Sequence, residues 1–191
     1  YQRCQSVVGH APVSREKSRV LLGRYPAIRS ELHMSQSLLY YLGRLIEDDS
    51  PRNLKGLETD IPDLQRIGKE FSFGDLYLYG KDEATGKELW EGREARRTVQ
   101  KLGAKVLSAG SKGHFDVVGP LTDILVFHGA PVLDEARKSH SMERKIYSYH
   151  NPQSGPENPA LFRARYGIQL WQAGFDGAMI YAYQHSMGSI W

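Results

Sequence analysis

The stretch DLYLYGKDE at residues 75–83 decides the fold that this sequence predicts. Its residues 76–79, Leu-Tyr-Leu-Tyr, are aliphatic and aromatic side chains typical of a short buried strand. Gly80 and Lys81 then loosen the chain, and the adjacent carboxylates Asp82 and Glu83 follow at once. Because the loops after parallel strands line the cleft of α/β folds, an acidic pair at this position favours a catalytic site.

The remainder of the chain repeats the pattern of a strand followed by a helix or crossover. We predict strands at 75–79, 104–108, 123–127, 145–149 and 178–183, and helices at about 87–102, 131–140 and 158–174. This alternation predicts a parallel sheet. No glycine-rich phosphate loop follows any strand, which weakens a nucleotide-binding open sheet. A full barrel takes about 250 residues, so we expect a partial (β/α)8 TIM-type barrel.

The amino-terminal part is harder to interpret. Residues 1–53 are expected to form a mainly helical segment, and residues 54–191 the carboxyl-terminal part of the barrel. Within residues 1–53, local patterns suggest a strand at 7–10, helices at 14–23 and 35–47, and a loop at 48–52. A helix with Pro62 in its first turn is expected next. The chain lacks an initiator methionine and stops within an apparently continuing segment, so we expect a fragment of a longer protein.

Composition excludes several classes of protein. The net charge is +3, but 25 basic and 22 acidic residues are interspersed, so we predict no nucleic-acid partner. A single cysteine, Cys4, rules out an internal disulfide framework. No apolar run approaches the roughly 20 residues that a membrane span needs.

Polar side chains follow the later predicted strands. Besides the catalytic candidates Asp82 and Glu83, the substrate-binding candidates are His128, Tyr149, His150, Asn151, Tyr183 and Gln184. The ends of barrel strands converge on one mouth, so we expect these groups to line a polar pocket. His128, His150 and His185 also admit a metal hydrolase, but no HxH or HExxH spacing supports it, and we predict no metal or cofactor.

Trp90 and Trp171, on predicted helices, are expected to pack in the core.

The predicted strand ends supply no second carboxylate, which limits the glycosidase mechanisms that this chain could use. Ordinary glycosidases need two carboxylates across the cleft, but the later strand ends offer Ser108, His128, His150 and Gln184. Either the second acid lies outside this chain, or the substrate assists. In substrate-assisted hydrolysis the 2-acetamido oxygen of the sugar attacks its own anomeric carbon. Glu83 would then be the general acid/base, and Asp82 would stabilise the charge that develops on the amide nitrogen.

The segment YLYGKDEA and the block SYHNPQSGPENPALFRARYGIQLWQAGFDGAMIYAYQH together resemble the catalytic barrel of glycoside hydrolase family 123 and its relatives. The resemblance covers roughly residues 54–191. It implies substrate-assisted cleavage of β-linked N-acetylgalactosamine, with the family's Asp-Glu pair at Asp82 and Glu83. It also implies that Tyr149, Asn151, Tyr183 and Gln184 line the sugar site. The amino-terminal β-sandwich of characterised members and much of the first half-barrel are absent from this sequence.

We therefore expect a glycosidase of the β-N-acetylhexosaminidase type, with a glycan or glycoconjugate as its substrate. The alternatives are a non-catalytic carbohydrate-binding barrel fragment and, more weakly, a metal-dependent hydrolase. The family resemblance implies an extracellular or periplasmic location.

Overall fold

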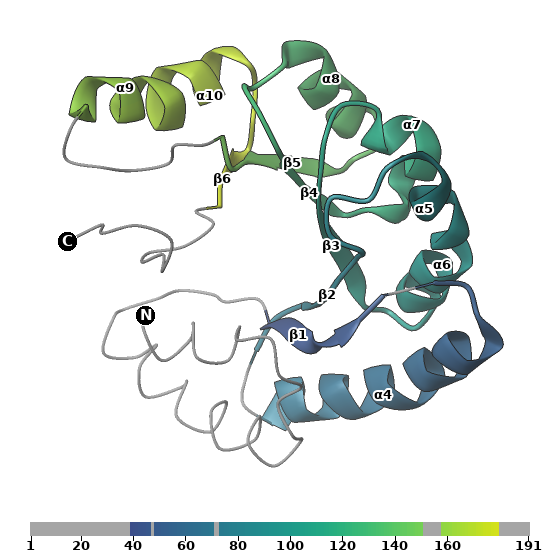
Figure 1. The fold of residues 1–191 in the computed structure, drawn as a ribbon. Helices are drawn as coiled ribbons and strands as arrows, with labels where there is room; N and C mark the ends of the chain where they lie inside the picture. The colour runs from purple at the N-terminus through teal and green to yellow at the C-terminus, as the bar shows by residue number, and fades with distance from the viewer. Residues whose placement is uncertain (1–38, 47, 71–72, 151–157, 180–191) are drawn as a thin grey trace. The chain divides into compact units, whose positions relative to one another are not determined.

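The described residues form an α/β arrangement built on a parallel sheet (Figure 1). The computed structural model describes residues 39–46, 48–70, 73–150 and 158–179. In sheet order the strands are β1 (Leu39–Leu45), β2 (Leu76–Tyr79), β3 (Lys105–Gly110), β4 (Ile124–Phe127), β5 (Lys145–Ser148) and β6 (Gly177–Ala178). The pairings β1–β2, β2–β3, β4–β5 and β5–β6 are parallel, which confirms the predicted α/β class. Of the last predicted strand, 178–183, only residues 178 and 179 are described, and Ala178 is the second residue of the two-residue strand β6.

Helices connect most of these strands. They are α4 (Pro51–Glu70), α5 (Gly86–Glu91), α6 (Arg93–Lys101), α7 (His114–Val118), α8 (Leu133–Ser141), α9 (Pro159–Arg163) and α10 (Gln169–Gln172). The predicted helix at 87–102 is two helices separated at Gly92. The predicted helix at 131–140 is confirmed as α8. None of the described helices is long and apolar enough to cross a membrane.

The predicted helix at 35–47 is wrong, because residues Leu39–Leu45 form strand β1. The error came from a helical spacing of leucines, a local signal. The strand is stabilised by a distant partner: Leu39 pairs with Leu76 and Tyr41 with Leu78 in parallel register. Backbone groups along the edge of β2 need hydrogen-bond partners, and β1 supplies them. The predicted elements at 7–10 and 14–23 lie outside the described residues.

The helix predicted to start around Pro62 starts instead at Pro51, and Pro62 lies inside α4. At Pro51 the absent N–H costs nothing, because first-turn N–H groups have no partner within the helix. Ser50 caps this end, its hydroxyl accepting from the Asn53 N–H at 3.3 Å. An interior proline costs about 3 kcal/mol. Burial of aliphatic side chains at about 1.5–3 kcal/mol each outweighs it, since Leu57, Ile61 and Leu64 are buried.

The chain divides into two compact units, each with its own core. The first comprises Tyr1–Lys81 and Glu91–Leu107, and the second comprises Asp82–Trp90 and Ser108–Trp191. In the first unit, α4 and α6 pack side chains against β2 and β3: Leu57, Ile61, Leu64, Ala95 and Val99 meet Leu76, Leu78 and Val106. In the second, β4 and β5 contribute Leu125, Phe127 and Ile146, which pack with Phe115, Ala136, Leu170, Ala173 and Phe175.

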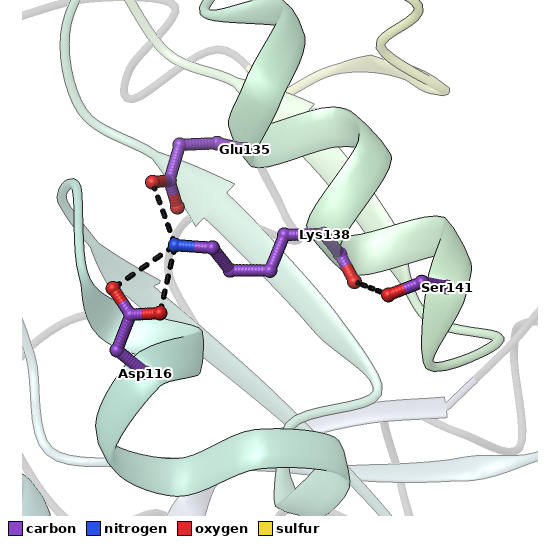
Figure 2. A network of polar contacts seen from close by, with 4 residues as sticks. All are labelled: Asp116, Glu135, Lys138 and Ser141. Atoms are coloured by element: carbon purple, nitrogen blue, oxygen red, sulfur yellow. Dashed lines mark hydrogen bonds and ion pairs between the residues drawn. The ribbon is translucent and has the colours of Figure 1, made fainter.

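The Lys138 side chain joins two helices of the second unit (Figure 2). The Lys138 ammonium of α8 lies 2.8 Å from Asp116 of α7 and 3.2 Å from Glu135, one turn earlier in α8. Glu135 is only 2% exposed. Hydrogen bonds, the one to Asp116 first, raise the pKa of Lys138. The ammonium therefore stays charged at neutral pH, and its contribution to stability is lost only as pH rises through that raised pKa.

The helix predicted at 158–174 contains a π-helical turn at Ala164–Ile168, between α9 and α10. Asn158 caps its start, and its side-chain oxygen accepts a hydrogen bond from the Leu161 N–H at 3.0 Å. Leu161, Ala164, Ile168 and Trp171 repeat at helical spacing, which predicts one buried stripe, but none of the four is buried. A π-turn adds a residue to the helix, so every later side chain rotates away from the face that a 3.6-residue period predicts.

The rotation buries Leu170 and Ala173 and leaves Ile168 and Trp171 exposed. Trp171 is 77% exposed, and Trp90 at the end of α5 is 61% exposed. The expectation that both tryptophans pack in the core is therefore also wrong.

We expect Lys138→Met to lower the free energy of unfolding by about 2 kcal/mol, because it leaves the buried Glu135 carboxylate without its cation. Chemical denaturation at pH 7 measures the change. Arg137→Met is the matched control: its pairing with Asp134 joins side chains that are 70% and 84% exposed, so we expect a change below about 0.5 kcal/mol. Equal effects of the two substitutions would contradict the role given to Lys138.

Candidate active site

The turn after β2 carries the acidic pair. Gly80 still belongs to the sheet, since its N–H donates to the Leu107 carbonyl at 2.8 Å. Asp82 and Glu83 form the turn itself, and Glu83 has a left-handed backbone with φ of 46°. A non-glycine residue in this region costs about 1 kcal/mol. The chain therefore leaves the pleat at the acidic pair, rather than at Gly80 as the sequence suggested.

The strain at Glu83 accompanies a specific contact. The hydroxyl of Tyr149 donates a hydrogen bond to Oε1 of Glu83, across 66 positions of sequence. Tyr149 follows β5 directly, and its N–H donates to the Phe127 carbonyl of β4 at 3.1 Å. Its side chain is only 8% exposed. A phenol held by the sheet thus fixes one oxygen of an exposed carboxylate.

His128 covers one face of the same phenol. It follows β4, and its N–H donates to the Gly110 carbonyl at the end of β3 at 2.7 Å. The imidazole stacks on the Tyr149 ring with 5.0 Å between ring centroids and 21° between the planes. Stacking restricts both rings, so it also orients the hydroxyl that reaches Glu83.

His150 connects this group to the π-turn. The Tyr166 hydroxyl donates to the His150 carbonyl at 2.8 Å, and the His150 N–H donates to the Ser148 hydroxyl at 3.2 Å. Burial of the imidazole lowers the pKa of His150, and the positive charges of Arg165 and His128 lower that pKa further. Nδ1 of His150 is buried and has no hydrogen-bond partner among the described residues.

The second unit thus brings together four of the predicted site residues: Glu83, His128, Tyr149 and His150. Asp82 lies next to Glu83 in the same turn. The other three predicted residues, Asn151, Tyr183 and Gln184, lie outside the described residues. Within the described residues no three histidine, cysteine or acidic side chains are grouped so that they could hold a metal ion. His185, of the metal alternative, lies outside this part of the chain.

Sequence reasoning missed Arg165 and Tyr166. Both lie in the π-turn, at positions that helical periodicity leaves without a role. Single π-turns occur frequently at functional sites, but the sequence gives no signal for one. The carboxylate, phenol and imidazoles of this group are side chains that can transfer protons and form hydrogen bonds with a polar ligand.

Comparisons with protein-family models, curated proteins and solved structures found no match to this chain.

We expect Glu83→Gly to be more stable than Glu83→Ala by about 1 kcal/mol, because both remove the Tyr149 contact but only glycine tolerates the left-handed backbone. The free energy of unfolding of the two variants measures this. At Glu58, an exposed position inside α4, the same pair of substitutions is expected to show the reverse order by about 1 kcal/mol. Alanine more stable than glycine at position 83 would contradict the left-handed turn.

Proposed function

We propose that this chain is the carboxyl-terminal part of a (β/α)8 glycoside hydrolase that cleaves N-acetylhexosamine glycans, most closely β-N-acetylgalactosaminides. The observation that carries the proposal is the hydrogen bond from Tyr149 to Glu83, which joins the acidic turn to the end of β5. A strained, anchored carboxylate beside stacked aromatic rings is typical of a catalytic group. The family 123 resemblance of residues 54–191 supports the same assignment.

In the first step of the proposed reaction, Glu83 acts as a general acid. Tyr149 donates to Oε1, so the transferable proton belongs on Oε2. Glu83 gives this proton to the glycosidic oxygen while the C1–O bond breaks. The 2-acetamido carbonyl oxygen attacks C1 at the same time and forms an oxazolinium ion.

In the second step, Glu83 accepts a proton from water as the water attacks C1 and the C1–O bond of the oxazolinium ion breaks. This regenerates the acetamido group and retains the β configuration. Asp82 accepts a hydrogen bond from the amide N–H and stabilises the positive charge of the intermediate. Tyr149 is a positioning residue, because it acts through the Glu83 carboxylate.

A second candidate is a carbohydrate-binding module without turnover. The exposed indoles of Trp90 and Trp171, both in the second unit, favour it. Indole faces are flat and apolar, with a polar N–H, and suit stacking on sugar rings. In that case glycan binding would not depend on the Glu83 carboxylate.

The test is hydrolysis of aryl β-N-acetylgalactosaminide and β-N-acetylglucosaminide by wild-type protein and by Glu83→Gln. We expect Glu83→Gln to lower kcat/KM at least about 100-fold, the usual contribution of a general acid. Activated aryl leaving groups should recover part of the loss, because they need no protonation. A thiazoline analogue of the intermediate should inhibit the wild type.

Glu88→Gln is the matched control, since Glu88 is an exposed carboxylate of α5 only five positions away. We expect it to keep wild-type turnover. Full activity of Glu83→Gln would exclude the mechanism. If the folded wild type and the Glu83→Gln variant bind these sugars equally well and neither protein hydrolyses them, the chain is the binding module instead.

A further inference from the structure

His128 is an exposed aromatic residue at the edge of the candidate site. It follows β4 directly, and its backbone is held by the hydrogen bond from its N–H to the Gly110 carbonyl of β3. The residue is exposed, whereas Tyr149, on whose ring it stacks, is only 8% exposed. A buried phenol and an exposed imidazole are therefore layered here.

The phenol covers one face of the His128 imidazole and leaves the other open. The two ring planes are 21° apart and their centroids 5.0 Å apart, so the Tyr149 ring lies against a single face. Gly129, the next residue, has φ of 110° and carries no side chain that could fold over the imidazole. An imidazole that is covered on one face and still exposed offers its other face and its edges to a ligand.

The covered face connects this imidazole to the acidic turn. The Tyr149 hydroxyl donates to Oε1 of Glu83, so imidazole, phenol and carboxylate form one continuous group within the second unit. A ligand on the outer face of His128 is thus separated from the proposed acid by the stacked rings and one hydrogen bond. This distance suits a ring that belongs to the substrate of Glu83.

We propose that the outer face of the His128 imidazole is a platform on which a sugar ring of the glycan substrate stacks, with a preference for the galacto configuration. The identity of the ligand rests on the proposed function. Aromatic faces carry partial negative charge and attract C–H groups. In a galactoside the axial 4-hydroxyl leaves the C–H groups at C3, C4 and C5 on the opposite face, as one apolar patch. In a glucoside the C–H groups are divided between the two faces.

Two other roles for His128 make different predictions. If its ring nitrogens bind the ligand by hydrogen bonds, a side-chain amide could replace the imidazole and phenylalanine could not. A stacking platform predicts the reverse order, because phenylalanine keeps the flat aromatic face. If His128 only holds Tyr149 in place, its replacement would change turnover through Glu83 and leave the affinity for sugar unchanged.

The first test measures the dissociation constant of methyl β-N-acetylgalactosaminide for wild type, His128→Phe and His128→Asn by NMR titration. We expect His128→Asn to weaken binding about tenfold, the upper end for one aromatic contact. His128→Phe should stay within about threefold of the wild type. Tighter binding by the asparagine variant than by the phenylalanine variant, or equal affinity in all three proteins, would overturn the platform.

His140→Asn is the matched control. His140 pairs with Asp176 at 3.1 Å, and Asp176 accepts from the Ile146 N–H near the start of β5, whereas Tyr149 follows the other end of that strand. We expect the control to keep the wild-type affinity for the sugar. Thermal unfolding of each variant separates a lost contact from a lost fold.

Saturation-transfer NMR on the wild type needs no variant. We expect the transfer to be largest at the protons on C3, C4 and C5 of methyl β-N-acetylgalactosaminide, the face that lies on the ring. Methyl β-N-acetylglucosaminide should bind more weakly, and His128→Asn should reduce the difference between the two sugars. Equal transfer to all ring protons, or no binding of either sugar, would contradict the proposal.

The platform and the hydrolase fail separately. Sugar binding in the expected order of variants, without any hydrolysis, would leave the platform intact and contradict only the proposed hydrolase. Hydrolysis that depends on Glu83, with a sugar affinity that His128→Asn leaves unchanged, would leave the hydrolase intact and contradict only the platform.

Discussion

The hydrogen bond from Tyr149 to Glu83 is the interaction on which the candidate site depends. Without it, an exposed carboxylate on a turn would sample many rotamers. Parallel pairing of β4 with β5 brings His128 and Tyr149 to the same end of the two strands, and from there the phenol hydroxyl reaches Glu83. The buried Tyr149, stacked on His128, transmits that rigidity to Glu83.

The cost of this arrangement is local. The left-handed backbone at Glu83 costs about 1 kcal/mol, comparable to the net gain of one hydrogen bond. The rest of the second unit therefore has to hold the turn. Ala84, which directly follows the turn, provides that support, because it is buried in a cluster with Leu89, Val118 and Leu121. Strained residues that the surrounding structure holds in place occur often at functional sites.

Local sequence signals predicted β2, β3, β4 and β5 because each is a short apolar run between turn residues. Polar residues that follow these strands are the predicted site candidates, and four of them, Glu83, His128, Tyr149 and His150, do lie together. Local sequence signals failed at β1, where pairing with β2 overrode a helical leucine spacing. Local sequence signals also missed Arg165. A π-turn changes which side chains share a helix face, and the spacing of apolar residues does not reveal where a π-turn occurs. Nor does the sequence reveal that Glu83, rather than a glycine, adopts the left-handed backbone.

A double-mutant cycle between Glu83→Gln and Tyr149→Phe, measured as kcat/KM for aryl β-N-acetylgalactosaminide, tests the central claim most directly. If Tyr149 acts through Glu83, removing its hydroxyl should reduce the rate about tenfold in the wild type but less than about twofold when Glu83 is already glutamine. A coupling of that size in kcat/KM would show that Tyr149 contributes to turnover through the Glu83 carboxylate. Equal losses in both backgrounds, or a wild type without turnover, would contradict it.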